Sequence, residues 1–382
     1  MATSKRLKLA LLMGGASSEH DVSVFSGLRV LKVLDPARYE VTPVLIERDG
    51  SWCFGSIPEA LSLEVEAGAI DDRVAVQVGV DQSGVSLRAS RGEQSVKPTG
   101  ESGALERLSS GLFDVAFIAL HGLGGEDGTV QGLLSLAGLP FTGSGLLASA
   151  LAMDKVVAKH FYRIRSLPVA EDLVLLSTDP VEGNLACRIE EKCGFPCVAK
   201  PATGGSSFGT CIVSVPEEID AAVVGALEES DRVLFERLIV GTELTCGVLG
   251  GGVLEPTLPL PVTEIVPMGS AFFDFRAKYT TSACEEVTPA RIPDAIARLV
   301  QQIAREAHDV LGCEGMSRSD FMLDGSEPIL LETNTIPGMT ATSLLPQGAA
   351  AAGISFPQLI DRLVRSALLR AGDARADDLE GI

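Results

Sequence analysis

Residues 9–19 read LALLMGGASSE, and this stretch decides the fold class. Five apolar residues run into a pair of glycines, and two serines then precede a segment with apolar residues at helical spacing, at Val24, Leu28 and Leu31. The pattern predicts a buried strand, a glycine turn and a helix whose first turn is capped by a serine. Such a unit is typical of an α/β layer.

A second stretch, residues 113–128, repeats this order with the sequence FDVAFIALHGLGGEDG. Strand, turn and helix units in series build parallel sheets covered by helices, so we expect an N-terminal parallel α/β domain over residues 1–145. His121 follows the second strand, at the edge where open α/β sheets bind ligands, although a purely structural histidine fits this position equally well. Residues 60–110 carry no interpretable motif and are expected to elaborate this domain.

The remainder of the chain is expected to form two further α+β domains and a tail. A helical, Ala- and Leu-rich stretch opens at Gly145, and strand patterns follow at 196–200 and 233–237. A longer helix pattern ends at Gly312, before two more strand patterns. We therefore expect a central domain at 146–235, a C-terminal domain at 236–370, and a flexible acidic tail at 371–382.

Composition excludes several classes of partner. The 382 residues carry a formal net charge of −20, which would repel nucleic acid and anionic membranes. No apolar run reaches the ~20 residues of a membrane span, and the apolar run near the N-terminus is shorter than the ~7–15 residues of a signal peptide. The eight cysteines have no metal-site spacing. A cytoplasmic protein with reduced thiols is expected.

Residues 200–209, KPATGGSSFG, follow a predicted strand and suit a polyphosphate. Glycines let backbone N–H groups approach phosphate oxygens, hydroxyls add donors, and Lys200 adds a positive charge. The loop is not a Walker A motif, because Thr210 and Cys211 stand where that motif needs Lys and Ser/Thr. An exposed Gly-Ser turn is the structural alternative.

Two further groups of residues point to a metal and a lid. Arg318 and Asp320 alternate along one predicted strand, and Glu332 and Asn334 along the next, so each pair shares a face. Carboxylate and amide oxygens suit Mg²⁺. Residues 272–279, FFDFRAKY, are either an apolar staple or a mobile lid that excludes water from a reactive intermediate.

Together these segments resemble the D-alanine:D-alanine ligase family of the ATP-grasp superfamily, from about residue 9 to about residue 368. Individually the motifs are weak, but their order is specific to this family. They lie at residues 14–23, 119–122, 124–132, 142–145, 153–155, 200–209, 278–279 and 332–343. The resemblance implies a three-domain ATP-grasp architecture, combining α/β and α+β layers behind the N-terminal domain.

The resemblance also implies an ATP site and a metal site. The residues expected to hold the ATP phosphates are Lys155, Lys200, Ser206 and Ser207. Those expected in the rest of the nucleotide pocket are Glu236, Arg237, Leu238, Ile239, Glu243, Phe272, Met322 and Leu331. Two Mg²⁺ or Mn²⁺ ions are expected on Asp320, Glu332 and Asn334, where they would neutralise the transferred phosphate.

The implied reaction joins two D-alanine molecules through a D-alanyl phosphate, to supply a peptidoglycan precursor. Glu19, linked to Ser206 and Tyr279, would position the first D-alanine, near His121. Arg318 and the Gly338 N–H would stabilise the oxyanion formed when the second amine attacks. Lys278 and Ser343 would also bind substrate, Ser343 by the second carboxylate. The family implies a cytoplasmic homodimer.

Three alternatives stay open. A D-alanine:D-lactate or D-alanine:D-serine ligase would use the same machinery, although Tyr279 favours D-alanine. Another ATP-grasp enzyme, such as a biotin-dependent carboxylase or a different carboxylate-amine ligase, would have no reason to carry Glu19 and Ser343 together. An inactive homologue would be expected to lose Arg318 or a metal ligand. Ile336 and Leu238 depart from the usual family residues.

Overall fold

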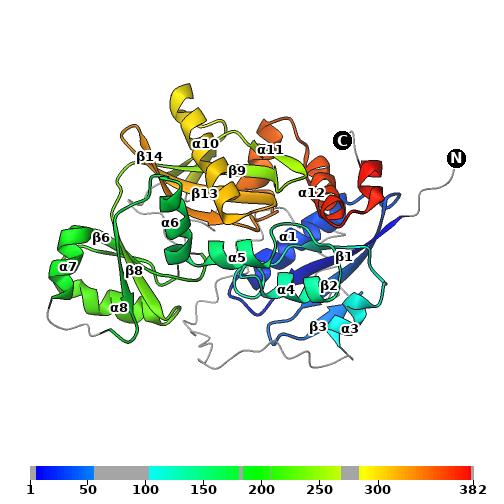
Figure 1. Ribbon diagram of the computed structural model, residues 1–382, viewed down its shortest axis with the longest axis horizontal. Helices are drawn as coiled ribbons and strands as arrows, with labels where there is room; N and C mark the ends of the chain where they lie inside the picture. Colours follow the sequence, from blue (N-terminus) through cyan, green and yellow to red (C-terminus); the bar gives the residue numbers. More distant parts are fainter. Residues whose placement is uncertain (1–5, 56–102, 180–183, 207, 268–283, 380–382) are drawn as a thin grey trace. The chain divides into compact units, whose positions relative to one another are not determined.

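The computed structural model describes residues 6–55, 103–179, 184–206, 208–267 and 284–379. The chain divides into two compact units, one of residues 1–143 and 336–382 and the other of residues 144–335 (Figure 1). The predicted lid at 272–279, Ser207, and residues 60–102 of the predicted insertion lie outside the described residues.

The first unit contains a four-stranded sheet in the order β3-β2-β1-β4. Its strands are β1 (Leu7–Gly14), β2 (Tyr39–Ile46), β3 (Trp52–Phe54) and β4 (Val115–Ile118). β1 pairs in parallel with β2 and β4, while β3 adds an antiparallel edge. The apolar run predicted as a first strand is buried at the centre of this sheet. The predicted N-terminal parallel α/β layer is confirmed.

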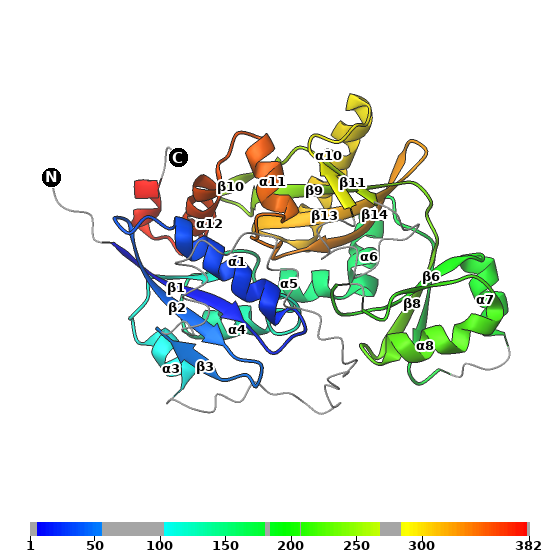
Figure 2. The same ribbon diagram turned by 180° about the vertical axis from the view of Figure 1, so that it is seen from behind.

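Helices from both ends of the chain complete this unit (Figure 2). α1 (His20–Val33) packs on β1, and α3 (Ala104–Ser109) and α4 (Thr129–Leu136) follow. From the C-terminus come α11 (Leu344–Ala351) and α12 (Phe356–Arg370). α12 contacts β4 and α1, and its Asp361 accepts hydrogen bonds from Tyr39 Oη at 2.6 Å and Arg38 at 2.8 Å. Residues 336–370 therefore belong with the N-terminal sheet, not with the C-terminal domain to which the sequence assigned them, because α12 buries its apolar face here.

The segment expected to be a flexible tail contains a short helix that ends at residue 379. Residues Ala374–Leu379 form the 3₁₀ helix η2, which packs on α12 and buries Ala376 and Leu379. Arg375 pairs with Asp114 at 3.0 Å and with Asp373 at 2.5 Å. Two buried apolar side chains and these ion pairs hold a segment that its acidic composition alone predicts to be loose.

The second unit begins with a helix pair and an antiparallel sheet. α5 (Leu146–Met153) and α6 (Lys155–Ile164) replace the single predicted helical stretch. The sheet has the order β5-β8-β6-β7, with β5 (Asp172–Leu176), β6 (Cys197–Pro201), β7 (Cys211–Val213) and β8 (Arg232–Arg237). Its apolar core is closed by α7 (Leu185–Lys192) and α8 (Ile219–Leu227), and η1 (Pro216–Glu218) leads into α8.

A six-stranded sheet completes the second unit, in the order β12-β11-β9-β13-β14, with β10 paired to β9. The strands are β9 (Thr242–Gly251), β10 (Glu255–Pro259), β11 (Thr263–Pro267), β12 (Cys284–Val287), β13 (Gly315–Asp324) and β14 (Glu327–Asn334). α10 (Asp294–Leu311) ends at Gly312, as predicted, with φ +71°. Together with α5 and α6, it buries one apolar face of the sheet, in a core where Tyr162 of α6 packs with Phe321 of β13 and Leu330 of β14.

Candidate active site

Four predicted site residues lie on one face of the β13–β14 pair. Arg318 is directly opposite Asn334, and Asp320 is directly opposite Glu332. Opposed residues of antiparallel strands project to the same face, with Cβ atoms ~4.5–5.5 Å apart. Between them, Ser319 and Thr333 project to the other face and hydrogen-bond at 2.9 Å. The predicted alternation is therefore confirmed, and the two strands place two carboxylates, an amide and a guanidinium together.

A β-bulge adjusts this face. The register shifts between Asp320 and Phe321, so that Phe321 pairs with Leu330, Asp320 pairs with Glu332, and Leu331 is the extra residue. Leu330 is thereby buried in the core, whereas Leu331 and Glu332 are both partly exposed. Bulges commonly re-aim side chains beside active sites. This one lets β14 turn consecutive residues away from the core.

Asp320 is held by three donors. Arg318 Nε and Nη2 lie 2.9 and 2.8 Å from its two carboxylate oxygens, and Thr245 Oγ1 donates to Oδ1 at 2.7 Å. Two parallel charged hydrogen bonds fix both the distance and the plane of a guanidinium. Arg318 is therefore oriented by the carboxylate that the sequence predicts to be a metal ligand. Thr245, which the sequence analysis did not select, lies opposite Asp320 on β9.

Lys155 connects the predicted phosphate loop to this face. The helical stretch breaks at Asp154, whose Oδ1 accepts the N–H groups of Val156 and Val157 at 3.1 Å each and so starts α6. Lys155 Nζ then donates to the Gly204 carbonyl at 2.7 Å and lies 3.7 Å from Glu332 Oε2. A cation at a helix start, between a glycine loop and a carboxylate, is suitably placed for phosphate.

The loop itself has an unusual backbone. Gly204 has φ +107°, and Ser206 has φ +52°, one of two non-glycine residues with positive φ among the described parts of the chain. Non-glycine residues in this region store strain and occur preferentially at functional sites. The positive φ of Ser206 therefore supports a functional role for this loop over an ordinary Gly-Ser turn.

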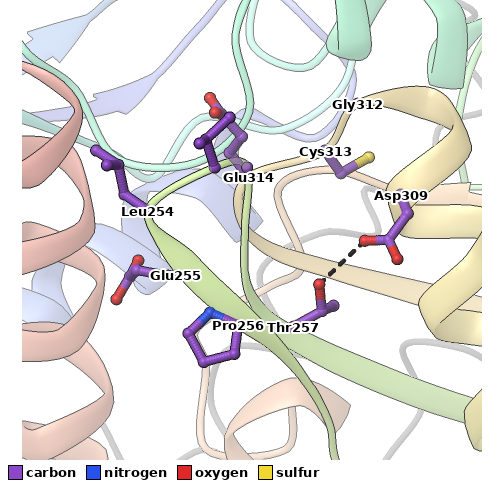
Figure 3. Close-up of a pocket in the computed structure, with 10 residues that line it drawn as sticks. Leu254, Glu255, Pro256, Thr257, Asp309, Gly312, Cys313 and Glu314 are labelled. Atoms are coloured by element: carbon purple, nitrogen blue, oxygen red, sulfur yellow. Dashed lines mark hydrogen bonds between the residues drawn. The ribbon is translucent and has the colours of Figure 1, made fainter.

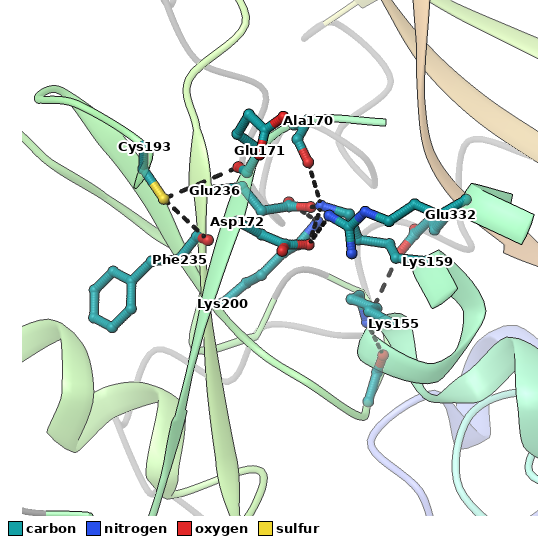
Figure 4. Close-up of polar contacts among 12 residues, drawn as sticks. Lys155, Lys159, Ala170, Glu171, Asp172, Cys193, Lys200, Phe235, Glu236 and Glu332 are labelled. Carbon is teal, nitrogen blue, oxygen red and sulfur yellow. Dashed lines mark hydrogen bonds and ion pairs between the residues drawn. The ribbon is translucent and has the colours of Figure 1, made fainter. Parts of the chain in front are cut away.

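A buried charge network lies beside the loop (Figure 4). The two oxygens of Glu236, on β8, are shared: Lys159 contacts Oε1 and Lys200 contacts Oε2. Lys159 Nζ also lies 2.7 Å from Asp172 Oδ2 and donates to the Ala170 carbonyl at 2.9 Å. The side chains of Lys159, Lys200 and Glu236 are all buried.

The network keeps its central pair charged. Burial is the largest influence on both groups and disfavours their charged forms. Opposite charges outweigh it: Glu236 and Glu332 raise the pKa of Lys200 above its usual value, while Lys200 and Lys159 lower the pKa of Glu236. At neutral pH this region therefore holds a protonated Lys200 beside an ionised Glu236.

Other residues predicted to contact the nucleotide are distributed around this network. Glu243 lies opposite Met322 across β9 and β13, on the face that carries Asp320. Ile239 is buried in a small apolar cluster against which Met322 packs. Leu238 is partly buried. Arg237, by contrast, is exposed and pairs with Asp324 at 3.2 Å. Ser207, Phe272, Lys278 and Tyr279 lie outside the described residues.

The first unit gathers a second set of predicted residues. Gly122, with φ +71°, allows close approach of Glu19, because a Cβ there would lie 2.7 Å from Glu19 Oε2. His121 is buried beside it. The serine cap predicted for α1 is not formed. The N-cap residue is Glu19, and its side chain makes no capping hydrogen bond. Ser17 instead donates its hydroxyl to the His121 carbonyl at 2.7 Å, which ties this turn to the turn that follows β4.

Ser26 links His121 to the C-terminal motif. Its hydroxyl lies 3.1 Å from His121 Nε2 and accepts the Met339 N–H at 3.2 Å. Gly338, the residue before Met339, packs closely against Ser343, because a Cβ on Gly338 would lie only 2.6 Å from Ser343 Oγ. Ser343 Oγ also contacts Thr340 Oγ1 at 2.7 Å. The structure thus brings His121, Gly338 and Ser343 into one connected region of this unit.

The donors on the polar face fit the predicted metal. Asp320 and Glu332 provide two carboxylates in direct register, and Asn334 adds an amide oxygen. Within the described residues no group of three or more His, Cys, Asp or Glu side chains is placed to hold a metal ion by itself. Mg²⁺ does not need such a group, since it binds few protein oxygens and keeps positions for phosphates and water.

A cavity of about 640 Å³ lies at the β9–β10 turn (Figure 3). It is lined by Leu254, Glu255, Thr257 and Glu314 among others, and Thr257 donates to Asp309 at 3.0 Å. None of the predicted site residues lines it. Its volume therefore has no part in the site described above.

Sequence reasoning missed Lys159, Thr245 and Ser26. Lys159 had a usable signal, because it stands four residues after Lys155 and so one helical turn along the same side of α6. Thr245 and Ser26 had none, since their roles depend on strand register and on packing between distant segments.

Comparison with known proteins identifies the family. The family model described as D-ala D-ala ligase N-terminus matches residues 8–144, and that described as D-ala D-ala ligase C-terminus matches residues 162–365. The chain belongs to the D-alanine–D-alanine ligase family. It is 38% identical over 376 residues to a D-alanine–D-alanine ligase of Mycobacterium avium, covering 97% of this chain and 99% of the relative. It is 40% identical to that of Syntrophobacter fumaroxidans, covering 96% and 99%.

Solved structures agree. The ligase of Coxiella burnetii matches with a TM-score of 0.75 and 28% identity, over 97% of this chain and 96% of that one. A Bacillus anthracis ligase complexed with ATP matches with a TM-score of 0.69 and 26% identity, over 96% and 99%. The VanG D-Ala:D-Ser ligase of Enterococcus faecalis matches with 0.73 and 30%, over 95% and 100%. The predicted family, ATP-grasp fold class and enzyme class are confirmed.

Proposed function

We propose that this chain joins two D-alanine molecules to D-alanyl-D-alanine, with conversion of ATP to ADP and phosphate, through a D-alanyl phosphate. One observation carries the assignment of residues: the register of β13 and β14 puts Arg318, Asp320, Glu332 and Asn334 on one face. Full-length similarity to D-alanine–D-alanine ligases supports the reaction.

The second unit would bind ATP and hold the transferred phosphate. Lys155, Lys200 and Ser206 would contact phosphates, while Glu236, Ile239 and Glu243 would form the nucleoside end of the pocket. Asp320, Glu332 and Asn334 would hold two Mg²⁺ or Mn²⁺ ions, which when bound neutralise phosphate charge during transfer. Arg318 would stabilise negative charge that develops on the acyl carbon's oxygen.

The first unit would bind the amino acids. Glu19 would accept the ammonium group of the first D-alanine, near His121. The Gly338 N–H would donate to the oxyanion, and Ser343 would hold the carboxylate of the second D-alanine so that its amine faces the acyl phosphate. Such positioning can contribute ~7–11 kcal/mol to lowering a barrier. No residue of the chain need be modified covalently.

The test uses purified protein with ATP, Mg²⁺ and either D-alanine or L-alanine. With D-alanine, but not with L-alanine, ADP and D-alanyl-D-alanine should form in equal amounts. A coupled assay measures ADP, and mass spectrometry measures the dipeptide. Because a D-Ala:D-Ser ligase is among the similar structures, D-serine and D-lactate should be offered as competing second substrates. Preferential formation of a mixed product would overturn the proposed specificity.

Assembly and location are part of the same proposal. We infer a homodimer in the cytoplasm, which the family resemblance supports. Within the residues that the structure describes, no helix has both the length and the apolar character to cross a membrane. Light scattering coupled to size-exclusion chromatography should give twice the 39.9 kDa mass of the chain. A monomer mass at assay concentration would contradict the dimer.

A further inference from the structure

Lys159 is the most completely enclosed cation of the charge network, and the reaction proposed above does not use it. It lies on α6 with 1% of its side chain exposed. Its ammonium group has three N–H donors, and it has three acceptors: the Ala170 carbonyl, Asp172 and Glu236. Lys159 therefore has no donor left for a ligand, and any effect on the nucleotide must act through its partners.

The strands explain why a cation is needed here. Asp172 on β5 lies directly opposite Glu236 on β8. Like charges at opposed positions destabilise a sheet, and both carboxylates are largely buried. The Lys159 ammonium contacts both of them, so it removes this repulsion.

A count of charges shows the effect on Lys200. The ion pairs made by Asp172 and Glu236 join these two carboxylates to three cations, Lys159, Lys200 and Arg163. Glu332, which also acts on Lys200, is balanced by Lys155 and is counted with it outside this group. The net charge of the group is therefore 3 − 2 = +1. Without Lys159 the remaining two cations would balance the two carboxylates, and Lys200 would serve only as the counter-ion of Glu236. With Lys159 present, one positive charge is in excess beside the phosphate loop.

We propose that Lys159 is a positioning residue that shares the Glu236 carboxylate with Lys200 and thereby leaves the positive charge of Lys200 for the phosphates of the nucleotide. The inference rests on the proposed function, because it takes Lys200 and Glu236 to be nucleotide contacts. It assigns no contact between Lys159 and ATP.

The test is ADP binding in Mg²⁺ without D-alanine, measured by titration calorimetry. Lys159→Met should weaken ADP binding by roughly tenfold or more, as expected for loss of one partner of a buried charged pair. Lys192→Met is the matched control: the same substitution, in the same unit, at an exposed position on α7. It should leave binding unchanged. Equal affinity of Lys159→Met and the parental protein would overturn the proposal.

A double variant separates charge from packing. Lys159→Met with Asp172→Asn again leaves one excess positive charge, 2 − 1 = +1, so ADP binding should return to within about threefold of the parental value. If Lys159 served only to fill space, the double variant would bind no better than the single one, which would overturn the proposal. Should Lys159→Met fail to fold, only the double variant is compared with the parental protein. ADP binding more than about threefold weaker than parental would then overturn the proposal.

The two proposals fail differently. A parental protein that binds ADP but makes no D-alanyl-D-alanine contradicts the proposed function and leaves the binding comparison intact. Normal dipeptide synthesis combined with unchanged ADP binding in Lys159→Met contradicts only the role of Lys159.

Discussion

Arg318 and Asp320 form a two-point ion pair, with Nε 2.9 Å from Oδ1 and Nη2 2.8 Å from Oδ2. The pair joins two predicted functions, because Asp320 is a proposed metal ligand and Arg318 a proposed oxyanion donor. A planar guanidinium held at two points has one orientation, whereas an ammonium in its place would contact a single oxygen. The position of the donor is therefore set by the carboxylate beside it.

Replacing Arg318 by Lys tests this dependence. The charge is retained but the two-point geometry is lost, so kcat should fall roughly 100-fold or more, as for loss of one oxyanion donor. Steady-state dipeptide synthesis gives kcat, and a thermal melt checks that the protein is folded. Arg298→Lys, at an exposed position on α10, is the matched control and should be silent. Parental kcat in Arg318→Lys would show that the geometry is unimportant.

Glu332→Gln tests the metal assignment. It removes one of the two carboxylates that face each other across β13 and β14, with almost no change of shape. Turnover should be abolished while the fold stays intact, because the transferred phosphate would lose its neutralising ion. Turnover should be followed as a function of Mg²⁺ concentration, with Glu327→Gln at the exposed start of the same strand as control. Retained activity in Glu332→Gln contradicts the assignment.

Gly338→Ala tests the close contact in the first unit. An added Cβ would lie 2.6 Å from Ser343 Oγ, so the serine must move and its contact with Thr340 must change. We expect the KM for the second D-alanine to rise by roughly tenfold or more, through loss of ~1–3 kcal/mol from a displaced polar partner. Gly225→Ala on α8, where the added Cβ would meet no atom within 4 Å apart from its chain neighbours and the nearby backbone of its own helix, is the control. An unchanged KM would remove Ser343 from the carboxylate site.

Much of this site could be predicted because strands and local motifs are written in short stretches of sequence. The alternation of Arg318 with Asp320, and of Glu332 with Asn334, needed only the period of a strand, and the observed register confirms it. The same holds for the first strand and its glycine turn. These features depend on neighbours within a few residues.

What the sequence did not reveal depends on contacts between distant segments. Lys159 becomes significant only because β5 and β8 place Asp172 opposite Glu236. The expected serine cap of α1 is absent because Ser17 bonds to His121, 104 residues away. The tail was expected to be flexible because its composition is acidic, yet Arg375 anchors it to Asp114. Neither local spacing nor composition contains such pairings.

The buried His308 predicts a pH dependence of stability. It lies on α10, fully enclosed, with Nδ1 2.7 Å from Ser317 Oγ. Burial is the main cause that lowers its pKa to about 4, although Asp309 acts in the opposite direction. Between this value and the ordinary value of 6.5, the unfolded chain binds a proton that the folded chain does not.

The free energy of unfolding should therefore fall by roughly 2 to 3 kcal/mol through this group as the pH falls from 7 to 4.5. His308→Gln should be less stable than the parental protein at pH 7, by about 1 kcal/mol for the lost hydrogen bond, but should lose less stability on acidification. Urea unfolding at several pH values measures both effects. His160→Gln, at an exposed position on α6, is the matched control. Carboxylates also titrate in this pH range, so the decisive quantity is the difference between His308→Gln and His160→Gln in how steeply the free energy of unfolding changes with pH. Equal slopes would mean that His308 is protonated in the folded protein.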